Sequence, residues 1–210
     1  MKALKLLLCT LLCACLLAGC GIDADACVLS SLDAVCRSDY AEYSRLTGMT
    51  TQQISEEQTL FIEAQADRLI TILGGDSCSE EMRGRYVSFL KTVYASARYE
   101  SDQTKAAGNE ARITVYPITL LTVHTDELQE YADKFNAANE AFAYSSLGPQ
   151  EYADQYLDGC LGLLGAHLAS IEYGSGQTIA VELIRDDSGM YAIEPGTLGT
   201  ILETMLPMPG

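Results

Sequence analysis

Cysteine and histidine are the residue types in this 210-residue chain best suited to nucleophilic or metal chemistry, but their spacing predicts neither. His167 follows Cys160 by seven positions in a predicted helix, a rise of about 10 Å. A nucleophile and its base must lie within about 3 Å of each other. No two cysteines show the C-x-x-C spacing of zinc or redox sites. The spacing therefore predicts no catalytic dyad, no metal site and no cofactor.

The two histidines, His124 and His167, are expected to have structural roles. His167 stands one turn from Leu163 and Leu164, so we expect a half-buried histidine whose ring has a packing role. His124 follows a predicted strand and is expected at the strand's end, near the surface. The sequence also lacks the G-x-S-x-G, H-E-x-x-H, P-loop and dinucleotide-binding motifs. These observations argue against an enzyme.

The alternative function is that of an envelope hydrolase that uses carboxylate side chains. Acidic doublets at Glu56-Glu57, Glu80-Glu81 and Asp126-Glu127 are predicted in the first turns of helices, where negative charge stabilises the positive end of the helix dipole. A glycosidase needs two carboxylates about 5–10 Å apart, which can come from any part of a sequence. Scattered carboxylates therefore leave a hydrolase open as the second hypothesis.

The N-terminal segment has the layout of an export signal. Lys2 and Lys5 precede an apolar run over residues 6–17, which the small residues Ala18 and Gly19 separate from Cys20. The uninterrupted apolar stretch is about 15 residues, whereas a helix needs about 20 to cross a bilayer. We therefore expect a cleaved signal over residues 1–19 and a short tether over residues 20–26.

Leu17-Ala18-Gly19-Cys20 resembles the lipobox of bacterial lipoproteins. The resemblance implies that the Cys20 thiol receives a diacylglyceryl group, that the signal is cut before Cys20, and that the mature protein begins with a lipidated cysteine. Two or more acyl chains hold a protein on a bilayer where one chain barely does. The implied location is the extracytoplasmic face of the cell membrane. A plain secretory signal with a coincidental cysteine is the alternative.

The charge of the chain agrees with a covalent anchor. Removal of residues 1–19 leaves 11 basic and 29 acidic residues, a formal charge of −18. Such a domain is repelled by anionic headgroups and by phosphate backbones. No cluster of basic residues is present to bind nucleic acid. The expected partners are the bilayer, through Cys20, and an unknown envelope protein or small ligand.

Four cysteines lie beyond the predicted anchor: Cys27, Cys36, Cys78 and Cys160. Cys27 and Cys36 are about 13 Å apart if one helix holds both, too far for a bridge. Cys36 lies on the apolar face of that helix and Cys78 in a turn, so the preferred bridge joins Cys36 to Cys78. The alternative is that Cys36 and Cys160 are small core hydrophobes.

Periodicity and turn residues predict one α+β domain over residues 27–210. Helices are expected to pack on one face of a small antiparallel sheet made of two hairpins, in the order helices, hairpin, helices, hairpin, helix. Because the two halves share this plan, a divergent internal duplication is one interpretation. The predicted helices cover residues 27–47, 50–73, 77–94, 125–142, 149–171 and 197–205, and the predicted strands cover 98–103, 113–123, 178–185 and 190–193.

Several helix ends carry recognisable signals. Thr50 with Gln53 and Ser77 with Glu80 are predicted capping boxes. Thr125 is a predicted N-cap, and Pro149 suits a first helical position. Gly48 supplies a C-terminal stop.

Two further segments carry family resemblances. Residues 43–53 (YSRLTGMTTQQ) and 187–193 (DSGMYAI) resemble segments of small uncharacterised surface lipoproteins of Gram-positive anaerobes. The second is also similar to the end of nuclear-transport-factor-2-like domains, whose cone of helices and curved sheet often forms a pocket. The resemblance implies no catalytic residue. The sequence thus predicts a lipid-anchored extracytoplasmic binding or interaction module of the bacterial envelope.

Overall fold

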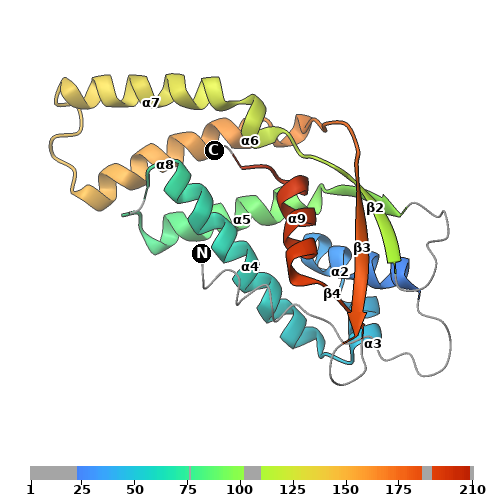
Figure 1. Ribbon diagram of the computed structural model, residues 1–210. Coiled ribbons are helices and arrows are strands. Elements are labelled where there is room, and N and C mark those ends of the chain that lie inside the picture. Colours follow the sequence, from blue (N-terminus) through green and yellow to red (C-terminus); the bar gives the residue numbers. More distant parts are fainter. Residues whose placement is uncertain (1–22, 76, 102–109, 186–190, 209–210) are drawn as a thin grey trace. The chain divides into compact units, whose positions relative to one another are not determined.

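The computed structural model describes residues 23–75, 77–101, 110–185 and 191–208 (Figure 1). Over these residues the protein is mostly helical with a small antiparallel sheet, which confirms the α+β class. The elements are α2 (Ala24–Arg37), α3 (Ala41–Thr47), α4 (Thr51–Ile72), α5 (Glu80–Ala95), β1 (Arg98–Ser101), β2 (Glu110–Tyr116), α6 (Leu120–Val123), α7 (Thr125–Glu140), α8 (Pro149–Ala166), the 3₁₀ turn η1 (Leu168–Ser170), β3 (Gln177–Arg185), β4 (Tyr191–Ile193) and α9 (Pro195–Met205).

The chain divides into two compact units that are interleaved in sequence. Among described residues, the first unit comprises the chain up to Phe61, Tyr94–Pro117 and Gly174–Leu206. The second comprises Ile62–Val93, Ile118–Tyr173 and the end of the chain after Leu206. The first unit contains the sheet, and the second contains the helical pair α7 and α8.

The sheet of the first unit has the strand order β1-β2-β3-β4 within the described residues, and all its neighbours are antiparallel. Ile113 of β2 faces Ile179 of β3, and Ala111 faces Val181. Buried and more exposed residues alternate along β2, as expected for a strand with one covered face. Helices α2 and α9 pack against β2. The turns predicted to close the two hairpins cover residues 105–110 and 186–189, and of these only Glu110, the first residue of β2, is among the described residues.

The predicted strand over residues 113–123 ends early, and the second half of that prediction was wrong. Strand β2 stops at Tyr116, and residues 120–123 form the short helix α6. Pro117 has no N–H to donate to a ladder, so it interrupts the pairing. Its carbonyl oxygen accepts a hydrogen bond from Gly174 N at 2.8 Å. The apolar run after Pro117 is therefore free to form a helical turn with buried Leu120 and Leu121.

The first predicted helix is two helices. Ser38 adopts the left-handed conformation, with φ of 57°, and ends α2 before α3 begins at Ala41. A helix end leaves carbonyl oxygens without intrahelical partners. Gln58 of α4 is buried and its side chain donates to Val35 O at 2.8 Å. This tertiary hydrogen bond stabilises the break, and the apolar spacing alone did not indicate it.

The predicted helix ends met mixed outcomes. Thr50 and Gln53 form the expected capping box, since Gln53 N donates to Thr50 Oγ1 and Thr50 N donates to Gln53 Oε1. Gly48 and Pro149 occupy the expected positions. The Ser77 box was wrong, because Ser79 Oγ accepts from Met82 N at the start of α5. Helix α2 begins at Ala24, earlier than predicted, because Asp23 accepts from Ala26 N.

The helix predicted over residues 125–142 ends before Phe142. Helix α7 ends at Glu140, and Phe142 lies in the following turn with φ of 64° and is 78% exposed. The buried aromatic residue of α7 is Phe135. Its ring centroid lies 4.5 Å from that of Tyr144 and 5.0 Å from that of Tyr152. The aromatic residues after α7 thus fold back onto the helix through Tyr144.

The partly buried carboxyl of Glu57, on α4, predicts a pH-dependent stability. Burial raises its pKa to about 7, and its Oε2 has no hydrogen-bond partner among the described residues. Between its ordinary value of 4.5 and about 7, the folded protein holds a proton that the unfolded chain releases. The free energy of unfolding should therefore fall as pH rises through this window.

Substitution Glu57→Gln removes the titration, so it should stabilise the protein above about pH 7 and flatten this part of the pH dependence. Urea unfolding at about pH 5 and about pH 8 measures the effect. Glu56→Gln is the matched control, because Glu56 is an exposed neighbour with the same charge. Equal pH slopes in the two variants would contradict the assignment.

Candidate metal centre

Two helix ends of the second unit position the three side chains of the candidate site. His124 occupies the N-cap position of α7, and its carbonyl oxygen accepts from Leu128 N at 3.0 Å. Glu127 lies in the first turn of the same helix. His167 is the C-cap residue of α8 and directly precedes η1. The chain therefore contributes two residues from one helix start and one from another helix end.

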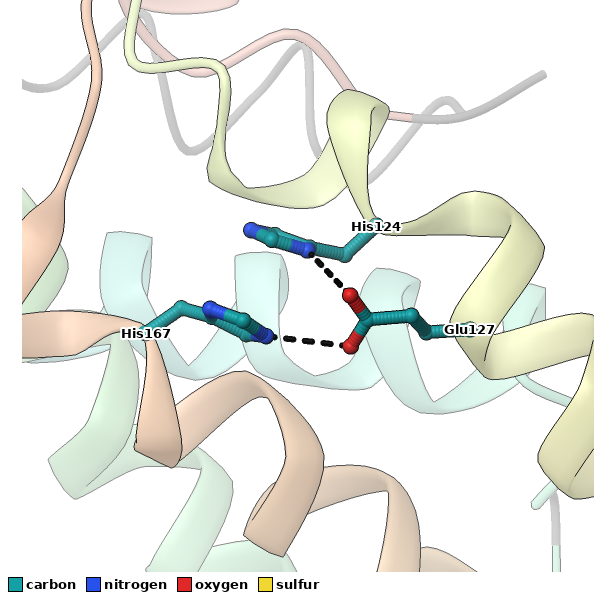
Figure 2. Close-up of side chains that lie close together, drawn as sticks. All are labelled: His124, Glu127 and His167. Atoms are coloured by element: carbon teal, nitrogen blue, oxygen red, sulfur yellow. Dashed lines mark hydrogen bonds and ion pairs between the residues drawn. The ribbon is translucent and has the colours of Figure 1, made fainter.

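The carboxylate of Glu127 lies beside the two imidazole rings and bridges one nitrogen of each (Figure 2). His124 Nδ1 is 3.2 Å from Glu127 Oε1, and His167 Nε2 is 3.0 Å from Glu127 Oε2. The rings themselves are stacked, with centroids 3.6 Å apart and planes 16° from parallel. One ligand atom from each residue lies within 4.8 Å of the other two.

Hydrogen bonding explains the electrostatics of this cluster. The contacts from His167 and then His124 hold the pKa of Glu127 below its usual range. An ionised carboxylate only accepts hydrogen bonds, so each facing ring nitrogen is the donor. In the neutral rings, His124 Nε2 and His167 Nδ1 are then the unprotonated nitrogens. The N-terminus of α7 also favours the negative charge of Glu127.

The three side chains are partly exposed to solvent. The exposed fractions of the side chains are 20% for His124, 48% for Glu127 and 30% for His167. Two imidazoles and one carboxylate are a ligand combination found in zinc sites with an open coordination position. Chemically, the arrangement can hold a divalent transition-metal ion or exist as a carboxylate-linked histidine pair.

Packing between α7 and α8 brings the residues together. The two helices lie side by side in the second unit (Figure 1). Tyr131 of α7 stacks on Tyr156 of α8 with centroids 5.7 Å apart. Gly159 of α8 gives the Tyr131 ring room, because a Cβ at this position would overlap the hydroxyl end of that ring. The start of α7 thereby meets the end of α8.

The histidine predictions had different outcomes. The half-buried, ring-packing role predicted for His167 is confirmed, and the packing partner is the ring of His124. The prediction that His124 ends a strand was wrong, because α6 precedes it. Thr125 is not the N-cap either: its hydroxyl donates to Thr122 O at 3.3 Å.

The sequence motifs do not connect His124, Glu127 and His167, and the sequence predicted no metal site. A usable signal was present in the helix lengths. Helices α7 and α8 have 16 and 18 residues and are joined by a short connection. Antiparallel packing of helices so matched in length places the start of the first beside the end of the second. His124 and Glu127 lie at the start of α7, before this connection, and His167 lies at the end of α8, after it.

The other predicted site residues are cysteines. Cys20 lies outside the described residues. Cys36 belongs to the first unit and Cys78 to the second, and the bridge between them stays a prediction. Cys36 is buried, donates to Met205 Sδ at 3.3 Å and has a raised pKa because of its burial. Burial also raises the pKa of Cys160 to about 11. Cys36 and Cys160 are core residues, as the alternative interpretation expected.

The acidic doublets at Glu80-Glu81 and Asp126-Glu127 do lie in first helical turns. The prediction for Glu56-Glu57 was wrong, because α4 begins at Thr51 and has no acidic residue in its first turn. Glu127 has the further role described above.

Comparison with known proteins identifies a fold but no family. No protein-family model matches the chain, and no curated protein sequence does. Among solved structures, the crystal structure of ycdA from Bacillus subtilis, a "putative lipoprotein", superposes with a TM-score of 0.59 at 15% sequence identity. The match covers 88% of this chain and 56% of that chain. The chain therefore shares its fold with a protein of which it spans just over half the length.

Within the described residues, no helix combines the length and the apolar character that a membrane span needs.

Gly159 predicts how the α7–α8 pairing responds to substitution. Gly159→Ala should destabilise the protein by about 1–3 kcal/mol, because the added methyl group displaces the Tyr131 ring. Gly162→Ala is the matched control on the same helix, since a Cβ there meets no atom within 4 Å. That change should stabilise by up to about 1 kcal/mol through helix propensity. Thermal unfolding compares the two, and equal shifts would disprove the packing role.

Proposed function

We propose that this chain is a lipid-anchored binding module on the extracytoplasmic face of a bacterial cell membrane. Its anchor is Cys20, and its ligand site is the His124, Glu127 and His167 cluster of the second unit. The observation that carries the anchor is the N-terminal layout: basic residues, an apolar run and then Leu17-Ala18-Gly19-Cys20. The fold likeness to a "putative lipoprotein" supports the same assignment.

The charge distribution supports anchoring by lipid rather than by protein contact with headgroups. The segment after the signal carries a formal charge of −18, which anionic lipids repel. Acyl chains attached to Cys20 supply the attraction through their buried CH₂ groups, each worth about 0.8 kcal/mol. The body of the protein then remains available to bind a ligand outside the membrane.

Binding is favoured over catalysis because the chain lacks the sequence motifs of the common hydrolases. The specific observation that favours a hydrolase is the cluster itself, in which two imidazoles and a carboxylate meet at a solvent-accessible position. Purified full-length protein should show no turnover of ester, phosphate, glycoside and peptide substrates. Reproducible turnover that Glu127→Gln abolishes would establish the hydrolase instead.

The anchor is tested by Cys20→Ser in the full chain expressed in a bacterium. Wild-type protein should fractionate with membranes, and mass spectrometry should find an acylated cysteine at its N-terminus. The Cys20→Ser protein should lose the lipid mass and the processing that depends on it, because a hydroxyl is a weak nucleophile beside a thiol. Cys78→Ser is the control, since Cys78 is a partly exposed thiol far from the lipobox in sequence. An unmodified Cys20 in the wild-type protein would refute the anchor.

A further inference from the structure

We propose that His124, Glu127 and His167 bind one divalent transition-metal ion, zinc or an ion of similar preference. This proposal rests on the proposed function, because it names the class of ligand for the same site. Its observations come from the second unit, so its test does not depend on the Cys20 anchor.

The donor set selects the class of ion. Imidazole nitrogen suits zinc, copper, nickel and iron, whereas calcium and magnesium prefer shells of oxygen ligands. The site offers His124 Nδ1, His167 Nε2 and a carboxylate oxygen of Glu127. Two nitrogens and one oxygen therefore favour a transition metal over an alkaline-earth ion.

The distances from nitrogen to carboxylate oxygen are close to the donor separation of a tetrahedral ion. Zinc bonds of about 2.0–2.1 Å at tetrahedral angles place neighbouring donors about 3.3 Å apart. His124 Nδ1 lies 3.2 Å from Glu127 Oε1, and His167 Nε2 lies 3.0 Å from the other carboxylate oxygen, Oε2. An ion would take the place of both hydrogen bonds, with the side chains rearranged around it.

Two local changes accompany binding. A ring nitrogen must be unprotonated to bind a metal ion. A neutral imidazole meets this requirement by changing tautomer, so that the proton moves to its other nitrogen. The nearly parallel rings must also tilt, so that their planes converge on the ion. Both rings are partly exposed, at 20% and 30% of the side-chain surface, so neither change requires opening the core.

The protein supplies three donors, which leaves a fourth tetrahedral position for water or for a donor atom of a further ligand. Such an open site can exchange its fourth ligand, unlike a closed structural zinc site with four protein donors. The formal charge of −18 beyond residue 19 also raises the local concentration of cations. The bound ion would connect the start of α7 to the end of α8.

The test is zinc titration of untagged, full-length protein, purified in detergent and stripped with a chelator. Calorimetry should show one saturable zinc site per chain, with calcium and magnesium failing to compete. Cobalt should bind at the same site and give the intense visible absorption of a tetrahedral ion. Zinc should also raise the unfolding temperature, since it binds the folded chain.

Three variants each remove one ligand: His124→Ala, His167→Ala and Glu127→Gln. Each should weaken zinc binding by at least about 100-fold, beyond the loss usual for a supporting residue. Asp126→Asn is the control, because it removes a charge next to Glu127 and leaves every donor in place. Cys78→Ser excludes zinc capture by a partly exposed thiol. Circular dichroism of the chelator-stripped variants confirms that each is folded.

Absence of saturable zinc binding, or equal affinity in the wild type and in each of the three variants, would overturn the proposal and leave the cluster as a carboxylate-linked histidine pair. Equal competition by calcium would overturn the choice of ion class. Zinc binding can fail in a protein whose Cys20 is lipidated, and zinc can bind normally to a protein whose Cys20 is unmodified. Failure of the metal-site proposal is therefore distinguishable from failure of the lipid-anchor proposal.

Discussion

The antiparallel pairing of α7 with α8 is the constraint on which the candidate site depends. His167 and Glu127 are 40 positions apart in sequence, and no local geometry could bring their side chains to 3.0 Å. The pairing depends in turn on Gly159, whose missing side chain makes room for Tyr131. Aromatic contacts farther along the pair, through Phe135 and Tyr152, hold the same two helices together.

Polar contacts fix α8 within the second unit from its other side. Tyr86 of α5 donates its hydroxyl hydrogen to Leu157 O at 2.9 Å, and Ser79 N donates to Asp154 Oδ1 at 2.8 Å. Arg85 of α5 pairs with Asp158. These groups anchor the middle of α8, between Asp154 and Asp158, and so help to fix the position of the helix that ends at His167. A helix so supported is a suitable base for a ligand-binding residue.

The proposed lipid attachment and the proposed metal site concern different parts of the chain. The proposed attachment depends on the four residues that end in Cys20 and on the signal before them. The proposed metal site depends on the folded second unit, where two helix ends meet. A shared fold with a "putative lipoprotein" at 15% identity links this chain to an architecture without assigning a ligand. The donor atoms of the cluster are the chemical basis for proposing a metal ion as the ligand.

The sequence by itself determined the α+β class, most helix positions and the Thr50 capping box, because these depend on periodicity and on contacts within a few residues. It did not indicate the break at Ser38, because the Gln58 side chain that supports this break comes from another helix. Nor did it indicate that the Cys36 thiol contacts Met205, which is 169 positions away. The lengths of α7 and α8 are a signal for their pairing, but tertiary structure decided that His124, Glu127 and His167 meet, since helix packing sets which distant side chains come together.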